Sequence, residues 1–189
     1  MREKKQWLCL IERMMGFMVP VTIETLVVAV LPTPSVVVLR PRHDEVLSER
    51  VLPIWIGPAE AASIGIALEG QTRLRPMTHD FLATTIQALG SDVERIVIDR
   101  VEGSTFYATV YLQRDGHIIN LDARPSDSIA LALRMNVPLF VDEDVLNSAS
   151  YPYDFSKERD TEAAMGDFRS FIDSISPEDF SREGRSGFE

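Results

Sequence analysis

Two nine-residue stretches decide the fold: IGPAEAASI at residues 56–64 and ARPSDSIAL at residues 123–131. When the two are aligned, Pro58 falls on Pro125, and an acidic residue, Glu60 or Asp127, follows two positions later in each. Proline is favoured at the first position of a helix, and an acid in the first turn is stabilised by the helix dipole. Both stretches therefore predict the start of a helix, and their likeness predicts an internal repeat.

The residues before each of these helices have the pattern of strands. Apolar, β-branched runs predict strands at 21–31, 35–40 and 51–56 before the first helix, and at 93–101, 104–112 and 117–123 before the second. Thr78 is expected to cap a helix between the two halves, and a short strand at 138–141 and a helical turn at 142–149 follow the second half. The predicted fold is α+β, with pseudo-duplicated three-strand-plus-helix units that form one mainly antiparallel or mixed sheet flanked by helices.

Length and charge bound the domain organisation. The 189 residues carry a net charge of -10, and the single cysteine, Cys9, excludes an intrachain disulfide framework and a cysteine-built zinc site. We expect an N-terminal extension at 1–17, a folded domain at 18–150 and an acidic helical tail at 151–189. The domain holds ten arginines, no lysine and 17 acidic residues, which argues against a protein that coats nucleic acid through its overall charge. The sequence has no signal-peptide pattern and no apolar run of membrane-spanning length, so we expect a cytoplasmic protein without a membrane partner.

The residues with chemical potential gather at the predicted helix starts. They are Glu60, the run Thr78-His79-Asp80, and the segment from Asp122 to Asp127, which includes Arg124 and Ser126. Free N–H groups at a helix start suit a phosphate oxygen, and carboxylates can hold Mg²⁺ or Mn²⁺, which generates a hydroxide nucleophile. A histidine can act as general acid or base near neutral pH, and an arginine can neutralise charge that develops on a phosphoryl group.

Several of these residues also have a purely structural interpretation. The dipole alone stabilises an acid in the first turn by about 0.3–1 kcal/mol, whereas a histidine there gains nothing from it. His43 and His117 fall in predicted hairpin turns, so we interpret both as solvated, and we interpret the acidic run 142–144 as a solvated charge run. Three aromatic residues could stack on bases, but their alternation within strands favours core or subunit-interface positions: Trp55, Phe106 and Tyr107.

Four stretches that contain these residues resemble the signature blocks of the bifunctional nuclease (BFN) domain family. They are LPIWIGPAEA at 52–61, RPMTHD at 75–80, GSTFYA at 103–108 and DARPSDSIA at 122–130, in the same order. The resemblance covers residues 21–149 and implies a compact α+β domain that forms homodimers and cleaves both RNA and DNA. It gives the polar positions a shared context but assigns them no roles. The matched polar positions are Glu60, His79, Asp80, Asp122, Arg124, Ser126 and Asp127.

We therefore expect a nuclease that acts on RNA and DNA with the help of a divalent metal ion, as a homodimer or higher homo-oligomer. The predicted catalytic residues lie at the three helix starts: His79, Asp80, Asp127 and Glu60. The predicted ligands of Mg²⁺ or Mn²⁺ are Asp122 and Asp127, with Glu60 or Asp80 as a further carboxylate. The predicted substrate-binding residues are Arg124, Ser126 and Arg75.

Two other functions fit the same residues. In a non-enzymatic dimeric binding or regulatory module, these groups would cap helices and tie the two halves together, for example through Arg124 and an acid. A small anion could instead bind at the helix start Gly57-Pro58 or Arg124-Pro125. Convergence of His79, Asp127 and Glu60 in an open cleft would favour the enzyme, and burial in internal salt bridges would favour the module.

Overall fold

A computed structural model describes residues 18–29, 33–42, 49–71, 73–153, 170–171 and 174–175 of the chain. Three consecutive antiparallel strands open the fold: β1 (Met18–Val27), β2 (Ser35–Pro41) and β3 (Arg50–Ile56). They lead into helix α2 (Pro58–Leu68). The predicted extension at 1–17, most of the predicted tail and His43 lie outside the described residues.

The second half repeats this order of elements. Three antiparallel strands, β4 (Asp92–Glu102), β5 (Thr105–Arg114) and β6 (His117–Ala123), lead into helix α4 (Pro125–Met135). Helix α3 (Thr78–Ala88) lies between the halves in sequence, and β7 (Leu139–Asp142), α5 (Glu143–Ala149) and β8 (Tyr151–Pro152) follow. The order of three strands and a helix thus occurs twice, whereas the duplication of structure stays a prediction.

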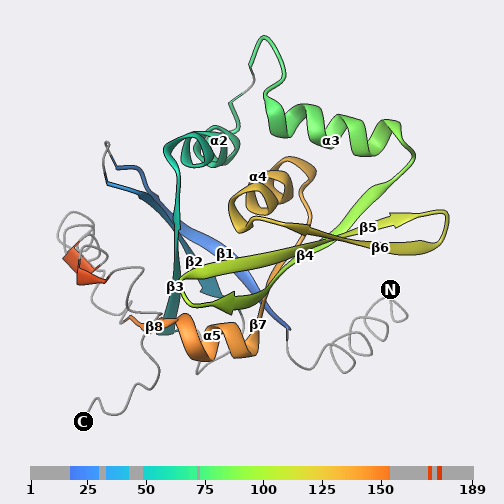
Figure 1. The fold of residues 1–189 in the computed structure, drawn as a ribbon. Helices are drawn as coiled ribbons and strands as arrows, with labels where there is room; N and C mark the ends of the chain where they lie inside the picture. The colour runs from blue at the N-terminus through green and yellow to red at the C-terminus, as the bar shows by residue number, and fades with distance from the viewer. Residues whose placement is uncertain are drawn as a thin grey trace.

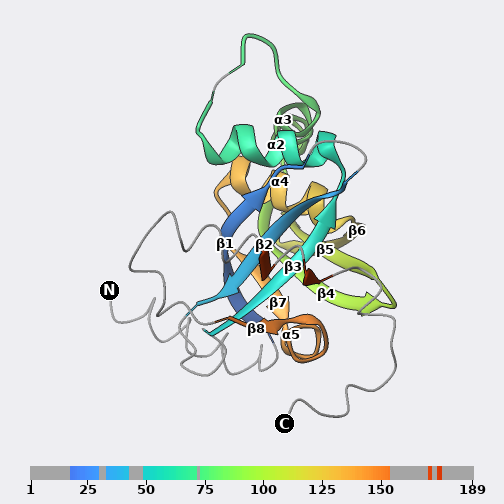
Figure 2. The same ribbon diagram turned by 90° about the vertical axis from the view of Figure 1, so that its left-hand side faces the viewer.

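The eight strands among the described residues form one sheet with the order β6-β5-β4-β7-β1-β2-β3-β8. The pair β4 and β7 is parallel, and the paired strands β1–β2, β1–β7, β2–β3, β3–β8, β4–β5 and β5–β6 are antiparallel. Helices α2, α3 and α4 lie together at one end of the twisted sheet and α5 lies at the opposite end, as two perpendicular views agree (Figures 1 and 2). The buried residues of α5 join the same hydrophobic cluster as those of α2 and α4. The predicted α+β class with a mixed sheet is confirmed.

The two predicted helix starts are confirmed as well. Pro58 and Pro125 are the first residues of α2 and α4, and the residues before them, Gly57 and Arg124, have extended backbones. The prediction for Thr78 is wrong in detail, because the N-cap of α3 is Met77, whose backbone N–H donates to the Asp80 carboxylate at 2.8 Å. The carboxylate of Asp80, two residues further on, therefore does the capping that was expected of the Thr78 hydroxyl.

The hydrophobic core explains why α2, α3 and α4 lie together. Helix α4 packs against both α2 and α3, and its buried apolar residues, Ile129, Ala130 and Leu131 among them, join the main hydrophobic cluster over the sheet. Tyr151 and Pro152 pair with β3, so the sheet includes two residues that were predicted to lie in the tail. None of the described helices is long and apolar enough to cross a membrane.

Candidate functional site

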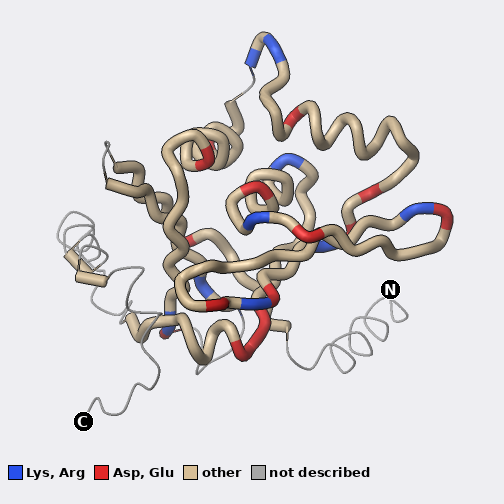
Figure 3. Tube along the Cα trace, viewed as in Figure 1, with Lys and Arg blue, Asp and Glu red and all other residues tan. Residues whose placement is uncertain are grey.

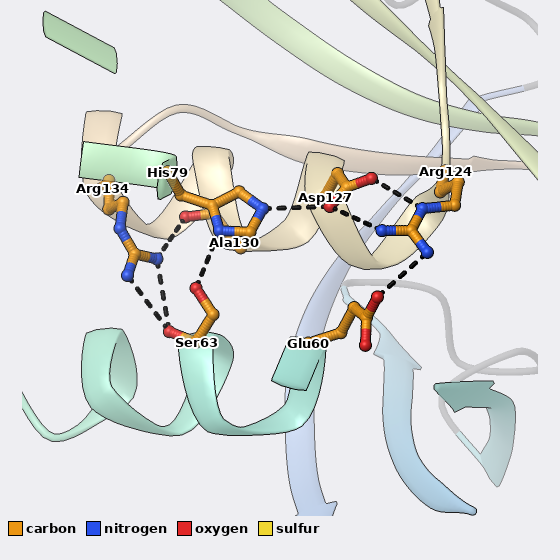
Figure 4. Close-up of polar contacts among 7 residues, drawn as sticks. All are labelled: Glu60, Ser63, His79, Arg124, Asp127, Ala130 and Arg134. Carbon is orange, nitrogen blue, oxygen red and sulfur yellow. Dashed lines mark hydrogen bonds and ion pairs between the residues drawn. The ribbon is translucent and has the colours of Figure 1, made fainter. Parts of the chain in front are cut away.

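The start of α3 lies against the middle of α2 and the first turn of α4, and together these helices bring five polar side chains into one series of hydrogen bonds and ion pairs, which we call the polar network (Figure 4). Its members are Glu60 and Ser63 from α2, His79 from α3, Arg124 from the N-cap of α4, and Asp127 from the first turn of α4. Three of the five, Glu60, His79 and Asp127, are predicted catalytic residues, and Arg124 is a predicted substrate-binding residue.

Arg124 stands at the exposed end of the polar network, with 65% of its side chain accessible. Its Nε and Nη2 donate to the two oxygens of Asp127 at 2.8 and 3.2 Å, and its Nη1 forms an ion pair with Oε1 of Glu60 at 3.0 Å. Asp127 raises the pKa of Arg124 above its already high value through its hydrogen bond and its negative charge, and Glu60 adds a smaller effect of the same kind. The guanidinium is therefore permanently charged and lies between two carboxylates.

Glu60 has room for this contact because residue 57 is glycine. A Cβ at Gly57 would lie only 2.4 Å from Oε2 of Glu60, which is closer than real Cβ contacts. The backbone at Gly57 is extended, with φ −72° and ψ 163°, so the conformation itself does not require glycine. What requires glycine is the space that the carboxylate fills.

His79 connects the network to the interior. Its Nε2 lies 3.0 Å from Oδ1 of Asp127, and its Nδ1 lies 2.9 Å from Oγ of Ser63. Exposure falls along this path, from 33% of the Asp127 side chain to 12% of His79 and 3% of Ser63. Burial raises the pKa of Asp127, but the hydrogen bonds from Arg124 and His79 outweigh it and hold this pKa below its usual value. Asp127 is therefore an ionised acceptor at neutral pH.

A second series of contacts starts from Arg134, near the end of α4. This arginine is 9% exposed and donates to Oδ1 of Asp80, to the carbonyl of Ala130 at 2.9 Å and to the carbonyl of Ser63 at 3.3 Å. The N–H of Met77 and the Arg134 guanidinium lower the pKa of Asp80. Both oxygens of Asp80 are thus engaged in fixing the start of α3 and its place beside α4.

The structure does not bring the other predicted site residues into the polar network. Asp122 lies on β6 and is exposed, and because its neighbour Ala123 packs on the helix-side core, the Asp122 side chain points to the opposite face of the sheet. Ser126 is buried in the first turn of α4, and Arg75 is exposed in the segment before α3. Among the described residues, no group of three His, Cys, Asp or Glu side chains is placed to hold a metal ion.

Several structural interpretations made from the sequence agree with these positions. His117 is exposed at the start of β6, and Phe106 is buried in the core. Asp142 accepts the N–H of Asp144 at 2.9 Å and caps α5, which gives this acidic residue a local structural role.

Sequence reasoning missed Ser63 and Arg134. Ser63 follows Glu60 by three residues, so a helical reading of 58–68 places the two on neighbouring faces, and this spacing was the available signal. Arg134 gives no comparable signal, because its partners lie in α2 and α3 and nothing near it in the sequence marks them.

Comparisons with known proteins match a region of the chain that contains the polar network. A family model described as the bifunctional nuclease domain matches residues 37–154. An uncharacterized protein of Mycobacterium tuberculosis is 43% identical over 141 residues, which are 72% of this chain and 84% of that protein. A rice protein named bifunctional nuclease 1 (Oryza sativa subsp. japonica) is 27% identical over 113 residues, which are 56% of this chain but only 34% of the rice protein.

Proposed function

Because the chain belongs to the bifunctional nuclease domain family, we propose that it hydrolyses phosphodiester bonds of RNA and DNA at the polar network. The observation that carries the proposal is the exposed guanidinium of Arg124, which lies between the starts of α2 and α4 and is linked through Asp127 to His79 at the start of α3. An arginine with planar donors suits the oxygens of a phosphate, and the two helix starts beside it favour negative charge.

The residues of the network have separate roles in this proposal. Arg124 binds a phosphate of the substrate, and Asp127 holds the guanidinium in place through two hydrogen bonds. Glu60 holds Arg124 through one oxygen in the free protein and is the carboxylate that yields when a phosphate takes Nη1. His79 has both ring nitrogens in protein hydrogen bonds, so it can exchange a proton with a substrate only after one of these bonds opens.

The expected Mg²⁺ or Mn²⁺ was assigned to Asp122 and Asp127. Both oxygens of Asp127 accept hydrogen bonds from Arg124, one of them also faces His79, and Asp122 points to the other face of the sheet. These residues do not fit a shared metal ion, and no step of the proposal depends on one. Removal of metal ions in the assay below tests the expectation directly.

One observation favours the second candidate, a dimeric binding or regulatory module without catalysis. Within the polar network two carboxylates surround one guanidinium, so the charges are largely satisfied by internal ion pairs. Acidic and basic positions are also interspersed along the described trace rather than gathered by sign (Figure 3). Such an arrangement fixes the packing of α2 on α4 whether or not a substrate binds.

A nuclease assay separates the two functions. Wild-type protein should cut single-stranded RNA and DNA oligonucleotides, and Asp127→Asn and His79→Ala should each lower the rate by about 100-fold, the scale of a lost preorganised group. Asp92→Asn is the matched control, because this aspartate is exposed at the start of β4 and its replacement should leave the rate unchanged.

Each outcome of the assay has a meaning. Wild-type rates in both Asp127→Asn and His79→Ala would show that the network is not the active site. Cutting that survives EDTA would exclude metal assistance, and loss of cutting in EDTA with recovery on added Mg²⁺ or Mn²⁺ would support it. A wild-type protein that cuts neither nucleic acid but still binds it would favour the module.

A further inference from the structure

We propose that Ser63 is a positioning residue of the polar network: its hydroxyl holds the inner nitrogen of His79, so that the imidazole presents its Nε2–H to Asp127 and keeps Asp127 aligned with Arg124. The geometry of Ser63, His79 and Asp127 carries this inference, and its consequence for catalysis rests on the proposed nuclease function. Ser63 lies outside the set of residues predicted from the sequence.

Ser63 places a hydroxyl in a buried, otherwise apolar part of α2. Ser63 lies in the middle of α2, is 3% exposed and is surrounded in sequence by Ala61, Ala62 and Ile64. Serine is a poorer helix former than alanine, and a buried hydroxyl needs a hydrogen-bond partner. The Ser63 hydroxyl has one, because Nδ1 of His79 lies 2.9 Å away.

The charge state of Asp127 fixes the direction of the hydrogen bond at Nε2 and, when the ring is neutral, of the one at Nδ1 as well. An ionised Asp127 can only accept, so Nε2 of His79 carries a proton and donates it to Oδ1 at 3.0 Å. In the neutral imidazole Nδ1 is then an acceptor, and the Ser63 hydroxyl donates to it. Asp127 therefore selects the tautomer, and Ser63 and Asp127 hold the ring in one orientation from opposite ends.

Ser63 is itself held firmly enough to act in this way. Its backbone carbonyl accepts hydrogen bonds from both Nη1 and Nη2 of Arg134 at 3.3 Å, and Arg134 also donates to the carbonyl of Ala130 (Figure 4). Arg134 is anchored in addition on Asp80. These contacts tie the middle of α2 to α4 and place the hydroxyl against the His79 ring. The orientation of the ring is thereby linked to the packing of all three helices.

A second buried serine shows that burial alone does not give this role. Ser128 lies in α4, is 1% exposed, and its Oγ has no hydrogen-bond partner among the described residues. Replacement of Ser63 or of Ser128 by alanine removes the same atom from the same kind of environment. Only the first replacement takes a partner away from His79, so Ser128→Ala is the matched control.

The test combines imidazole nitrogen NMR with kinetics on the full chain. In uniformly ¹⁵N-labelled wild-type protein at alkaline pH, Nδ1 of His79 should have the shift of an unprotonated nitrogen that accepts a hydrogen bond, and exposed His117 is an internal reference. In Ser63→Ala the Nδ1 signal should move toward that of a free unprotonated nitrogen. On a single-stranded oligonucleotide, kcat should fall about tenfold while KM stays within about twofold. Ser128→Ala should change neither readout.

The possible results are distinct. Unchanged His79 nitrogen shifts in Ser63→Ala would overturn the inference. Changed shifts with an unchanged kcat in an active protein would overturn its consequence for catalysis, because the orientation of the ring would then not affect cutting. If the shifts move as expected but no variant and no wild-type sample cuts nucleic acid, the positioning of His79 by Ser63 stands and the nuclease function fails. Since alanine is the better helix former, α2 should stay folded, and far-UV circular dichroism checks this.

Discussion

Replacement of Gly57 by alanine should detach Glu60 from Arg124 and leave the fold intact. The added Cβ would lie 2.4 Å from Oε2 of Glu60, and because ordinary contact begins at 3.4 Å, the carboxylate must retreat by about 1 Å. The distance from Oε1 of Glu60 to Nη1 of Arg124, now 3.0 Å, would then approach 4 Å by this estimate, which is too long for a hydrogen bond. Glutamate is a flexible side chain, so it can make this movement without a shift of α2.

The effect on stability should be small. Alanine is a poorer N-cap than glycine by roughly 1 kcal/mol, but it restricts the unfolded chain and regains about 0.4–1 kcal/mol. The ion pair that is lost involves a guanidinium side chain with 65% exposure, and such pairs contribute at most about 1 kcal/mol. We therefore expect the free energy of unfolding to change by no more than about 1 kcal/mol, or about 2–4 °C in Tm.

The effect on phosphate binding should be larger in relative terms. Arg124 loses one of its two carboxylate partners, so a phosphate no longer competes with Glu60 for Nη1. If that competition costs up to about 1 kcal/mol, affinity for a single-stranded oligonucleotide should rise by up to about fivefold at low salt. Fluorescence anisotropy of a labelled oligonucleotide measures this change, with gel analysis to confirm that the oligonucleotide stays intact.

Two variants define the result that would refute this reasoning. Glu60→Gln removes the competing charge directly and should raise affinity by a similar factor. Gly65→Ala makes the same chemical change on the same helix, where the new Cβ would meet Leu26 at an ordinary 3.5 Å, and should leave affinity unchanged. Equal or weaker binding by both Gly57→Ala and Glu60→Gln would mean that Glu60 does not compete for Arg124.

Other predictions concern the contacts beneath the site. Arg134→Leu should lower the free energy of unfolding by about 2–3 kcal/mol in urea titrations, because it leaves Asp80 and the Ser63 carbonyl without their common partner; an unchanged midpoint would contradict this role. The folded-state pKa values of Asp80 and Asp127 lie below their usual values, so the unfolded chain binds more protons in acid. The stability they contribute is complete above about pH 4 and is lost as the pH falls through the lowered pKa values. Asp80→Asn should flatten the acid branch of Tm against pH, and a branch as steep as in wild type would count against this account.

The fold could be predicted largely because its main signals are local. The Pro58 and Pro125 helix starts depend on a proline and a first-turn acid within three residues, and both starts are confirmed. The hairpin turns between β4, β5 and β6 place Gly103 and Gly116 at positive φ, which glycine adopts without steric cost, so these turns also rest on a local signal. The two-residue strand β8 could not be foreseen, since it is defined by its pairing with β3 and not by its own sequence.

The candidate site likewise has contacts that can be predicted from local sequence and contacts that cannot. Arg124 and Asp127 are three residues apart at a helix start, so their contact follows from local geometry. The contact between His79 and Asp127 spans 48 positions and the one between Arg134 and Asp80 spans 54. These residues come into contact only when α2, α3 and α4 pack on the sheet. For this reason the sequence indicated three separate clusters, whereas the structure joins a member of each in the polar network. Asp122 shows the opposite case. It is close to Asp127 in sequence, but side chains alternate along β6, so Asp122 points to the other face of the sheet.

The alignment of residues 56–64 on 123–131 explains how the network is built. It places Glu60 opposite Asp127 and Gly57 opposite Arg124, and the two equivalent carboxylates bind the same guanidinium. A second arginine at position 57 would fill the space that the Glu60 carboxylate occupies, so the glycine and the arginine at equivalent positions are complementary. The two acids use three of the five N–H donors of this guanidinium, so a phosphate can take the remaining N–H on Nη1 and on Nη2 or can replace a carboxylate. The replaceable one is Glu60, because it holds Arg124 through one nitrogen whereas Asp127 holds it through two.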